Sequence, residues 1–368
     1  MSDEAAHVFS STSHSPELST SHHTMSTDIP GEAAEKWSEY KSTAQVIASS
    51  FAQSDNDRVS RWGARIGECA RYIGYAFEPV EGGYSRSLVS ARLCRVRSCP
   101  ICQWRRTLKI NHDIGRALQS LASAKSGNTI FHLTLTVRNC HVSELRETIQ
   151  GMLRAWSKMT RRKLFMGLTA WVRSVEVTRG RAWVKGDSHP HIHCLLVAPA
   201  GWATREREST KRWREEWRDV LSLPYLPVCE IHPLELDELG AGAREVLKYA
   251  VKPGEHTLRG GWLEAVALAL DRLRILGTSA NLKSKISDEL PEEEGEASTA
   301  AALDTTAVVE ELPIPNPTGK RCPVIICYKW QPRRKQYQLD AAHWGMDAVG
   351  WRAYLRAVQS APHWADSP

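Results

Sequence analysis

Three histidines, His189, His191 and His193, occupy alternate positions of a short apolar segment, and this spacing strongly constrains the fold. Side chains at positions i, i+2 and i+4 of a β-strand project from one face, so the three imidazoles point the same way. Ile192 and Cys194 then face the opposite side, where they can enter a core. A lone histidine would indicate only a half-buried strand. Three histidines in register predict a metal site.

The charge of the chain is unevenly distributed. The sequence has 368 residues, enough for one large domain or two, and 42% of them are hydrophobic, which is typical of a globular protein. Segments 1–56 and 286–316 carry net charges of −6 and −9, which leaves +21 on the rest of a chain whose total is +6. So large a positive charge favours a polyanion as partner. The alternative is a basic surface that only keeps the protein soluble.

Other global features predict a cytoplasmic protein. The sequence contains no apolar run of 18 residues, so we expect no transmembrane span and no membrane partner. The N-terminus lacks a basic region followed by an apolar one, as a secretory signal would have. The nine cysteines are odd in number and partly clustered, which argues for a reducing compartment.

Four of the cysteines have the spacing of metal ligands. Cys99 and Cys102 flank a Pro-Ile turn, Cys94 lies five residues upstream, and Cys69 is the natural fourth ligand for a tetrahedral structural zinc. The alternative is a set of reduced core cysteines. Basic side chains near the turn suit contacts with DNA phosphates, and the candidates are Arg95, Arg97, Arg105 and Arg106.

The periodicity of the central region predicts an α+β fold. Residues 129–137 alternate as a strand, 169–184 read as a hairpin turning at Gly180, and the histidine strand follows. A helix is expected near 104–124, amphipathic helices are expected at 145–156 and about 204–221, and an apolar helix is expected at 262–276. This order predicts an antiparallel sheet with a ferredoxin-like core flanked by helices.

A short helix is expected at residues 243–252, between Gly242 and Pro253. Glu245, Tyr249 and Lys252 share one of its faces, at i, i+4 and i+7. A tyrosine hydroxyl beside a carboxylate and an ammonium group can act as a nucleophile with a base and a charge stabiliser. Taken alone, the same pattern is typical of an ordinary surface helix.

Three motifs in one order resemble the replication initiators of rolling-circle plasmids, in the single-tyrosine branch of the endonuclease superfamily named for its His-hydrophobic-His strand. The motifs are the Phe-x-Leu-Thr-Leu-Thr-Val strand, the His-Pro-His-Ile-His strand and the Glu-x-x-x-Tyr-x-x-Lys helix. The segment Cys-x-x-x-x-Cys-Pro-x-Cys-x-Trp-Arg-Arg also looks like one found in that group. The resemblance covers roughly residues 67–255.

The resemblance implies a metal centre made by His191, His193 and the preceding Glu176. Two imidazoles and a carboxylate with open positions suit a catalytic divalent ion. The resemblance implies magnesium or manganese, whereas the ligand types alone leave zinc open. His189 matches a variable position, so we expect it to be an auxiliary group or a DNA contact.

The resemblance also implies the chemistry of DNA nicking. Tyr249 matches the nucleophile, which attacks origin DNA and leaves a 5′-phosphotyrosine and a free 3′-hydroxyl that primes synthesis. Glu245 matches the carboxylate that activates the second attacking group at termination, Lys252 matches the motif lysine, and Lys248 is expected to contact phosphate. The implied partners are plasmid origin DNA, single-stranded at the nick, with a host helicase and DNA polymerase. Whether the protein forms a homodimer is left open by the sequence.

The expected organisation has five parts: a disordered tail (1–56), a zinc-binding basic segment (57–128), the endonuclease domain (129–285), an acidic linker (286–316) and a C-terminal module (317–368). In the last we expect a strand at 323–330 and then a helix carrying Trp344, Trp351 and Leu355.

Three other classes of protein compete with the initiator. A single-strand transposase or a mobilisation relaxase shares the metal-and-tyrosine chemistry, although relaxases usually place the tyrosine before the histidines. A hydrolase of small molecules could use a His-x-His strand but would not need the positive charge. A non-enzymatic zinc-ribbon DNA-binding protein would explain the cysteines but not the histidine strand.

Overall fold

The computed structural model describes residues 32–123, 128–180, 187–203, 207, 209–234, 261–289, 312 and 321–359. Its helices are α1 (Glu32–Ala52), α2 (Asp57–Gly67), α3 (Pro100–Ser123), α4 (Leu145–Met159), α5 (Thr210–Leu221), α7 (Trp262–Leu270), α8 (Ala280–Glu289) and α10 (Ala348–Gln359), with a short 3-10 helix, Lys163–Phe165. Its strands are β1 (Tyr72–Val80), β2 (Gly83–Ala91), β3 (Thr129–Thr136), β4 (Cys140–His141), β5 (Ala170–Arg179), β6 (Asp187–Ala198), β7 (Cys229–Leu234), β8 (Leu276–Thr278), β9 (Val324–Gln331) and β10 (Gln336–Trp344).

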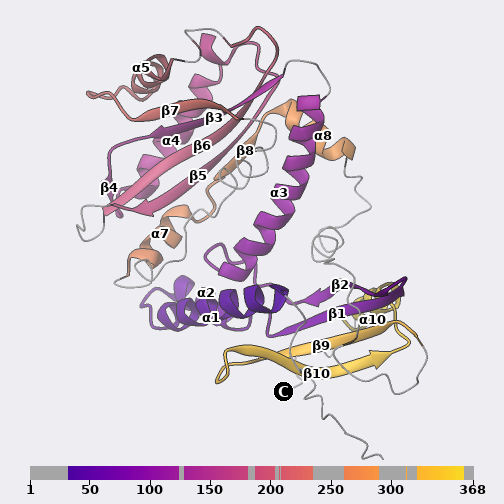
Figure 1. The fold of residues 1–368 in the computed structure, drawn as a ribbon. Helices are drawn as coiled ribbons and strands as arrows, with labels where there is room; N and C mark the ends of the chain where they lie inside the picture. The colour runs from indigo at the N-terminus through magenta and orange to yellow at the C-terminus, as the bar shows by residue number, and fades with distance from the viewer. Residues whose placement is uncertain are drawn as a thin grey trace, which may run out of the picture.

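Two antiparallel sheets organise the chain (Figure 1). The six-stranded sheet, which we call the histidine sheet because it contains residues 189–193, has the order β7-β3-β6-β5-β8, with β4 paired to β6. The four-stranded sheet has the order β10-β9-β1-β2. The long helix α3 runs between the two lobes (Figure 1). The prediction of an α+β fold with an antiparallel sheet flanked by helices is confirmed.

Period-two alternation gives each face of the histidine sheet its own partners. Odd positions of β3 and even positions of β6, such as Leu133 and Ile192, enter the main core together with residues of α4, α5 and α7. On the other face, Ile130, Val172 and Leu195 pack with residues of α3 and α8 in a smaller cluster. This cluster covers one end of that face only, and the polar residues of the histidine strand lie towards its other end.

The histidine strand β6 is central, with β3 on one side and β5 on the other. In the antiparallel register, His191 lies between Thr136 and Glu176, and His193 lies between Thr134 and Ser174. The hairpin expected at 169–184 is therefore made by β5 and the histidine strand itself. The second arm that we expected for it, at 181–184, lies outside the described residues.

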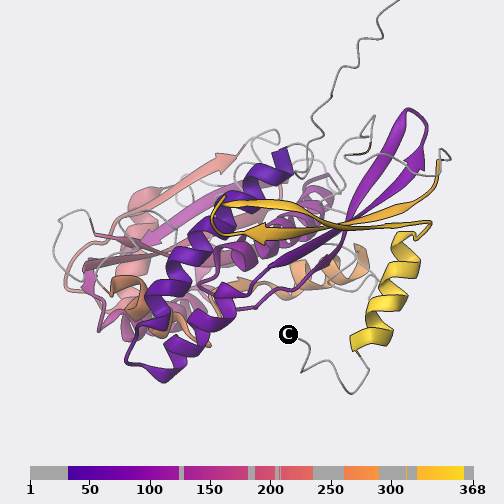
Figure 2. The same cartoon turned by 90° about the horizontal axis from the view of Figure 1, so that it is seen from below.

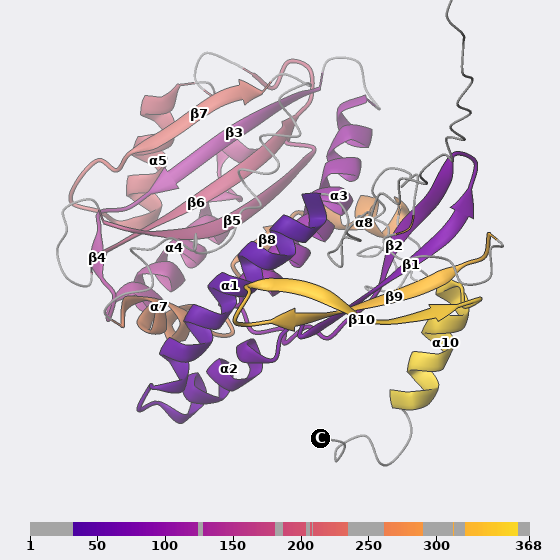
Figure 3. The ribbon, with the colours of Figure 1, turned by 60° about the horizontal axis from the view of Figure 1, so that its bottom comes forward.

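The C-terminal strands do not form a separate module. Strand β9 pairs with β1, so residues 324–331 complete a sheet that begins at Tyr72 (Figure 3). The expected helix with Trp344 is wrong at that position, because Trp344 ends strand β10 and the helix α10 begins at Ala348. Figure 2 shows α10 beside the β9–β10 hairpin, and Trp351 of this helix packs on Ile325 and Ala76. The expected acidic linker also begins later than 286, since α8 continues to Glu289.

The prediction of disorder through residue 56 is wrong for residues 32–52, which form α1. Trp37 and Phe51 of this helix are buried in the main core, and the Trp37 indole donates to the Tyr75 hydroxyl at 2.7 Å. Burial of such large aromatic side chains is worth several kcal/mol, on the order of 2–3 kcal/mol each. This packing stabilises a helix whose sequence has little amphipathic pattern.

Arginines from both lobes donate to backbone carbonyls at the end of α7. The Arg97 guanidinium donates to the carbonyls of Leu270 and Leu273, and Arg146 donates to those of Ala269 and Asp271 at 3.0 Å each. Cations at the end of a helix satisfy carbonyls that have no partner within it.

Among the described helices, none combines the length and apolarity that a bilayer crossing requires.

Candidate metal centre

Glu176, His191 and His193 converge on a single point of the histidine sheet. Both histidines place Nε2 beside the same oxygen, Glu176 Oε2, at 3.0 Å for His191 and 3.2 Å for His193. The three donor atoms all lie within 4.8 Å of one another, and all three residues are buried. A donor set of two imidazole nitrogens and one carboxylate fits a divalent ion that keeps open positions.

The neighbours of the histidines favour Nε2 as the ligand atom. His191 Nδ1 lies 3.2 Å from the carbonyl of His189, so a proton on Nδ1 is held there and the Nε2 lone pair can face an ion. His193 Nδ1 lies 3.3 Å from both His132 Nε2 and Thr134 Oγ1. Each imidazole therefore has an outer partner that orients its ring.

The carboxyl group of Glu176 is held in its ionised form. Burial opposes ionisation, but the hydrogen bonds and positive charge of His191 and His193 outweigh burial and hold the pKa of Glu176 well below its usual range. A carboxylate that stays ionised near neutral pH is ready to bind a cation.

The sequence interpretation missed two further histidines on this face. His132 of β3 stacks on His193 with ring centroids 5.4 Å apart, and it makes a T-shaped contact with His232 of β7, with ring centroids 5.1 Å apart. His132 and His232 are direct cross-strand neighbours. The alternation of residues 129–137 already placed His132 opposite the core-facing Phe131, so that alternation was the signal that could have found it.

His189 lies at the rim of the centre rather than among its ligands. Its Nδ1 lies 2.8 Å from Asn139 Oδ1, and Asn139 Nδ2 donates to Asp187 Oδ2 at 2.7 Å. Its ring is 5.3 Å from that of His191. The structure therefore places His189 in a polar chain beside the two converging histidines.

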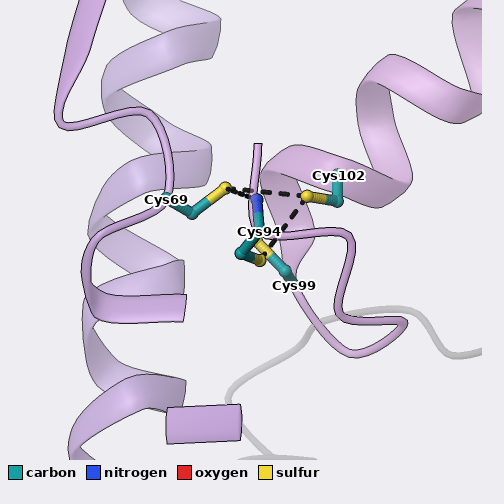
Figure 4. Close-up of side chains that lie close together, drawn as sticks. All are labelled: Cys69, Cys94, Cys99 and Cys102. Carbon is teal, nitrogen blue, oxygen red and sulfur yellow. Dashed lines mark hydrogen bonds between the residues drawn. The ribbon is translucent and has the colours of Figure 1, made fainter. Parts of the chain in front are cut away.

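The four predicted zinc ligands come together in the other lobe (Figure 4). The sulfurs of Cys69, Cys94, Cys99 and Cys102 lie within 4.8 Å of one another, and Cys102 Sγ is 3.6 Å from both Cys69 Sγ and Cys94 Sγ. Sulfurs about 2.3 Å from a tetrahedral zinc would be separated by roughly this distance. The backbone N–H of Arg95 donates to Cys102 Sγ at 3.2 Å. The cluster fits a closed, structural metal site.

Helix α1 supplies a buried cation to this cluster. Lys41 is 0% exposed, and its Nζ donates to the carbonyls of Gly67 and Cys69 at 2.8 and 2.6 Å. Burial lowers the pKa of Lys41, while nearby cysteine thiolates, led by Cys69, oppose that change. The lysine therefore ties α1 to the loop that carries the first cysteine.

Replacing Lys41 with methionine should lower the free energy of unfolding by about 2 kcal/mol, because the buried carbonyl of Cys69 loses the lysine as donor, whereas the Gly67 carbonyl keeps Gln45 Nε2 at 2.9 Å. Urea unfolding of the zinc-loaded protein measures the loss. Lys36→Met, an exposed change on the same helix, is the matched control and should stay close to wild type. Equal stability of the two variants would contradict this role for Lys41.

The four arginines predicted to contact DNA differ in their exposure. Arg95 and Arg106 are exposed. Arg105 is 3% exposed and lies over the rings of Trp37 and Trp104, and Arg97 binds the end of α7. Arg105 is thus buried in the protein, and the guanidinium of the partly buried Arg97 binds backbone carbonyls; phosphate contact by these two residues stays a prediction.

The expected helix with Glu245, Lys248, Tyr249 and Lys252 lies outside the described residues. The chain is described again at α7, where the Trp262 indole donates to Ser188 Oγ at 3.0 Å, on the histidine strand three residues before His191. Tyr249 precedes Trp262 by 13 residues.

Comparison with known proteins decides the family. The sequence model described as "Replication protein" matches residues 85–338, which include the histidine sheet and three of the four clustered cysteines. The chain belongs to the replication protein family. The resemblance to plasmid replication initiators is thereby confirmed.

Curated relatives of this replication protein carry the name "Protein rep". One from Streptococcus pneumoniae serotype 2 is 29% identical over 177 residues, covering 46% of this chain and 54% of that protein. One from Lactiplantibacillus plantarum is 26% identical over 231 residues, covering 55% and 72%. One from Bacillus amyloliquefaciens is 27% identical over 190 residues, covering 50% and 55%. The chain thus spans about half the length of the first and third. No solved structure matches this replication protein.

Proposed function

We propose that this chain initiates rolling-circle replication of a plasmid by nicking its origin DNA in a metal-dependent reaction. The observation that carries the proposal is the convergence of Glu176, His191 and His193 on one point of a sheet in a replication protein. The positive charge of the chain outside its acidic segments suits the DNA substrate.

In this proposal Glu176, His191 and His193 would hold a divalent ion, Mg²⁺ or Mn²⁺. When bound, the ion supplies positive charge that offsets the negative charge of the scissile phosphate. His132 and Thr134 keep His193 in place, so that its imidazole would face such an ion. His189 contacts the DNA from the rim of the centre.

The proposed nucleophile is Tyr249. Its hydroxyl oxygen forms a bond to the phosphorus as the bond to the 3′ oxygen breaks, which leaves a 5′-phosphotyrosine and a 3′-hydroxyl for a host polymerase. Lys252 and Lys248 offset phosphate charge. At termination Glu245 takes a proton from the second attacking group, a water molecule, whose oxygen replaces the tyrosine oxygen on the phosphorus.

The cysteine cluster has a structural role in this proposal. A zinc held by Cys69, Cys94, Cys99 and Cys102 stabilises the lobe that presents Arg95 and Arg106 to the DNA backbone. The proposed parts follow from these roles: a metal-binding basic segment at 57–128 and an endonuclease domain at 129–285. A host helicase would open the duplex ahead of the polymerase.

The family favours an initiator over the competing classes. A single-strand transposase or a relaxase could use the same chemistry, but the matched family is one of replication proteins. A non-enzymatic zinc-ribbon protein would have no need for the convergent Glu176, His191 and His193.

Incubation with a supercoiled plasmid that carries the origin tests the proposal. With Mn²⁺ added we expect nicked circles with protein attached at the 5′ end, and without added divalent metal we expect none. Intact supercoils in both reactions would overturn the proposed function, and a nick without attached protein would overturn the covalent step.

His132→Phe should weaken Mn²⁺ binding about tenfold, because it removes an outer partner of His193 while keeping an aromatic ring. Thr134 remains as a second partner, so the loss should lie at the low end of such effects. Isothermal titration of Mn²⁺ measures the change. His232→Phe, one strand farther out, is the control, and equal affinities for the two variants would contradict the role of His132.

A further inference from the structure

The face that carries the metal centre extends onto the edge strand β7. Thr136 is the cross-strand partner of His191, and its backbone N–H and Oγ1 both donate to the carbonyl of Val228, at 3.1 and 2.7 Å. Because cross-strand neighbours share a face, Val228 lies on the same side as His191, two strands away. Two strand spacings amount to about 10 Å.

The loop that leads into β7 is held in one conformation beside this point. The Arg138 guanidinium lies over the Tyr225 ring, 4.0 Å from its centroid, and the backbone N–H of Arg138 donates to the Tyr225 hydroxyl at 2.9 Å. Arg214 Nε donates to the carbonyl of Pro227 at 2.7 Å. A guanidinium stacked on an aromatic ring is a rigid planar cation, and binding it costs little conformational entropy.

Apolar side chains are exposed next to this cation. Leu226 is 40% exposed and Val228 is 58% exposed, and Arg138 is also exposed. Exposed apolar groups beside a charged centre need a partner that brings both flat apolar surface and negative charge. Unpaired nucleotides have both properties, since their bases stack on aromatic rings and guanidinium planes, whereas bases in a duplex are already stacked.

We propose that Arg138, Tyr225, Leu226 and Val228 form a platform that stacks bases of single-stranded DNA beside the metal centre. The proposal rests on the proposed function for the choice of DNA as ligand. It also assigns a position to the bases that flank the scissile phosphate and names the side chains that keep those bases unpaired.

Fluorescence anisotropy with two labelled probes of equal length tests the platform. One probe is oligothymidine and the other is the abasic sugar-phosphate strand, both in buffer without added divalent metal. Wild type should bind the oligothymidine five- to tenfold more tightly than the abasic strand, which corresponds to about one stacked base. Arg138→Ala and Tyr225→Leu should abolish that preference. Arg161→Ala, an exposed change next to α4 on the opposite face, should keep it.

Each result decides the proposal. The proposal is overturned if wild type and both platform variants prefer oligothymidine over the abasic strand to the same degree. It is also overturned if the variants lose affinity equally for both probes, because that result would indicate phosphate contact alone. A change from dimer to monomer in sedimentation of Val228→Ser, with unchanged DNA affinity, would assign the patch to a second copy of the chain. If Tyr225→Leu fails to fold, Arg138→Ala carries the test, because it keeps the backbone N–H that holds Tyr225. The assay involves no cleavage, so failure of the nicking reaction would leave its outcome unchanged.

Discussion

Tyr249→Phe should abolish covalent capture of an origin oligonucleotide, with a loss of at least about 10³-fold in adduct formed. Phenylalanine lacks the oxygen that forms the bond to phosphorus, and no proton shift can replace it. DNA binding should persist, because the metal centre and the exposed arginines are unchanged. Denaturing gel electrophoresis with a 3′-labelled oligonucleotide in Mn²⁺ measures the adduct.

The matched control is Tyr354→Phe, which removes the hydroxyl of a tyrosine that is 50% exposed on α10, outside the metal centre and the platform. This variant should form the adduct at close to the wild-type level. Adduct formation by Tyr249→Phe would show that another residue is the nucleophile, and the assignment of Tyr249 would be abandoned.

Cys102→Ser should remove zinc from the protein and unfold the lobe built around it. Cys102 Sγ lies 3.6 Å from two of the other sulfurs and accepts the Arg95 N–H, so its loss opens the cluster at its centre. Structural zinc sites contribute folding energy directly, and we expect the melting temperature to fall by about 10 °C or more. Elemental analysis and thermal unfolding measure the two effects.

Cys327→Ser is the control for this change, since Cys327 is partly buried in strand β9 and is not part of the four-cysteine cluster. It should keep its zinc and most of its stability. A Cys102→Ser protein with the zinc content and melting temperature of wild type would show that the cluster holds no structural metal.

The elements that local patterns encode were predictable from the sequence. The alternation in residues 129–137 and 189–197 determines which side chains share a face, and the structure pairs those two segments in register. The cysteine cluster was equally accessible, because the turn that holds Cys99 and Cys102 fixes two ligands locally. Glu176 needed the family resemblance, since a single acidic residue on a strand gives no local signal of metal binding.

Long-range packing was not predictable in the same way. Helix α1 was interpreted as disordered because its sequence has little periodicity, and contacts far along the chain, such as that of Trp37 with Tyr75, stabilise it. The buried Lys41 also depends on a distant partner, the carbonyl of Cys69. Strand β10 was missed because the basic turn at 333–335 hides a hairpin whose partner, β9, joins a sheet begun at residue 72.

The most direct test of the account is a Mn²⁺ titration followed by electron paramagnetic resonance, with plasmid nicking measured on the same samples. Wild type should bind one more Mn²⁺ per chain than the Glu176→Gln variant does. The variant lacks the negative charge that His191 and His193 both face. Nicking should fall at least about 10²-fold in that variant. Glu176→Gln protein that binds Mn²⁺ and nicks the plasmid as wild type does would contradict a catalytic metal centre at these three residues.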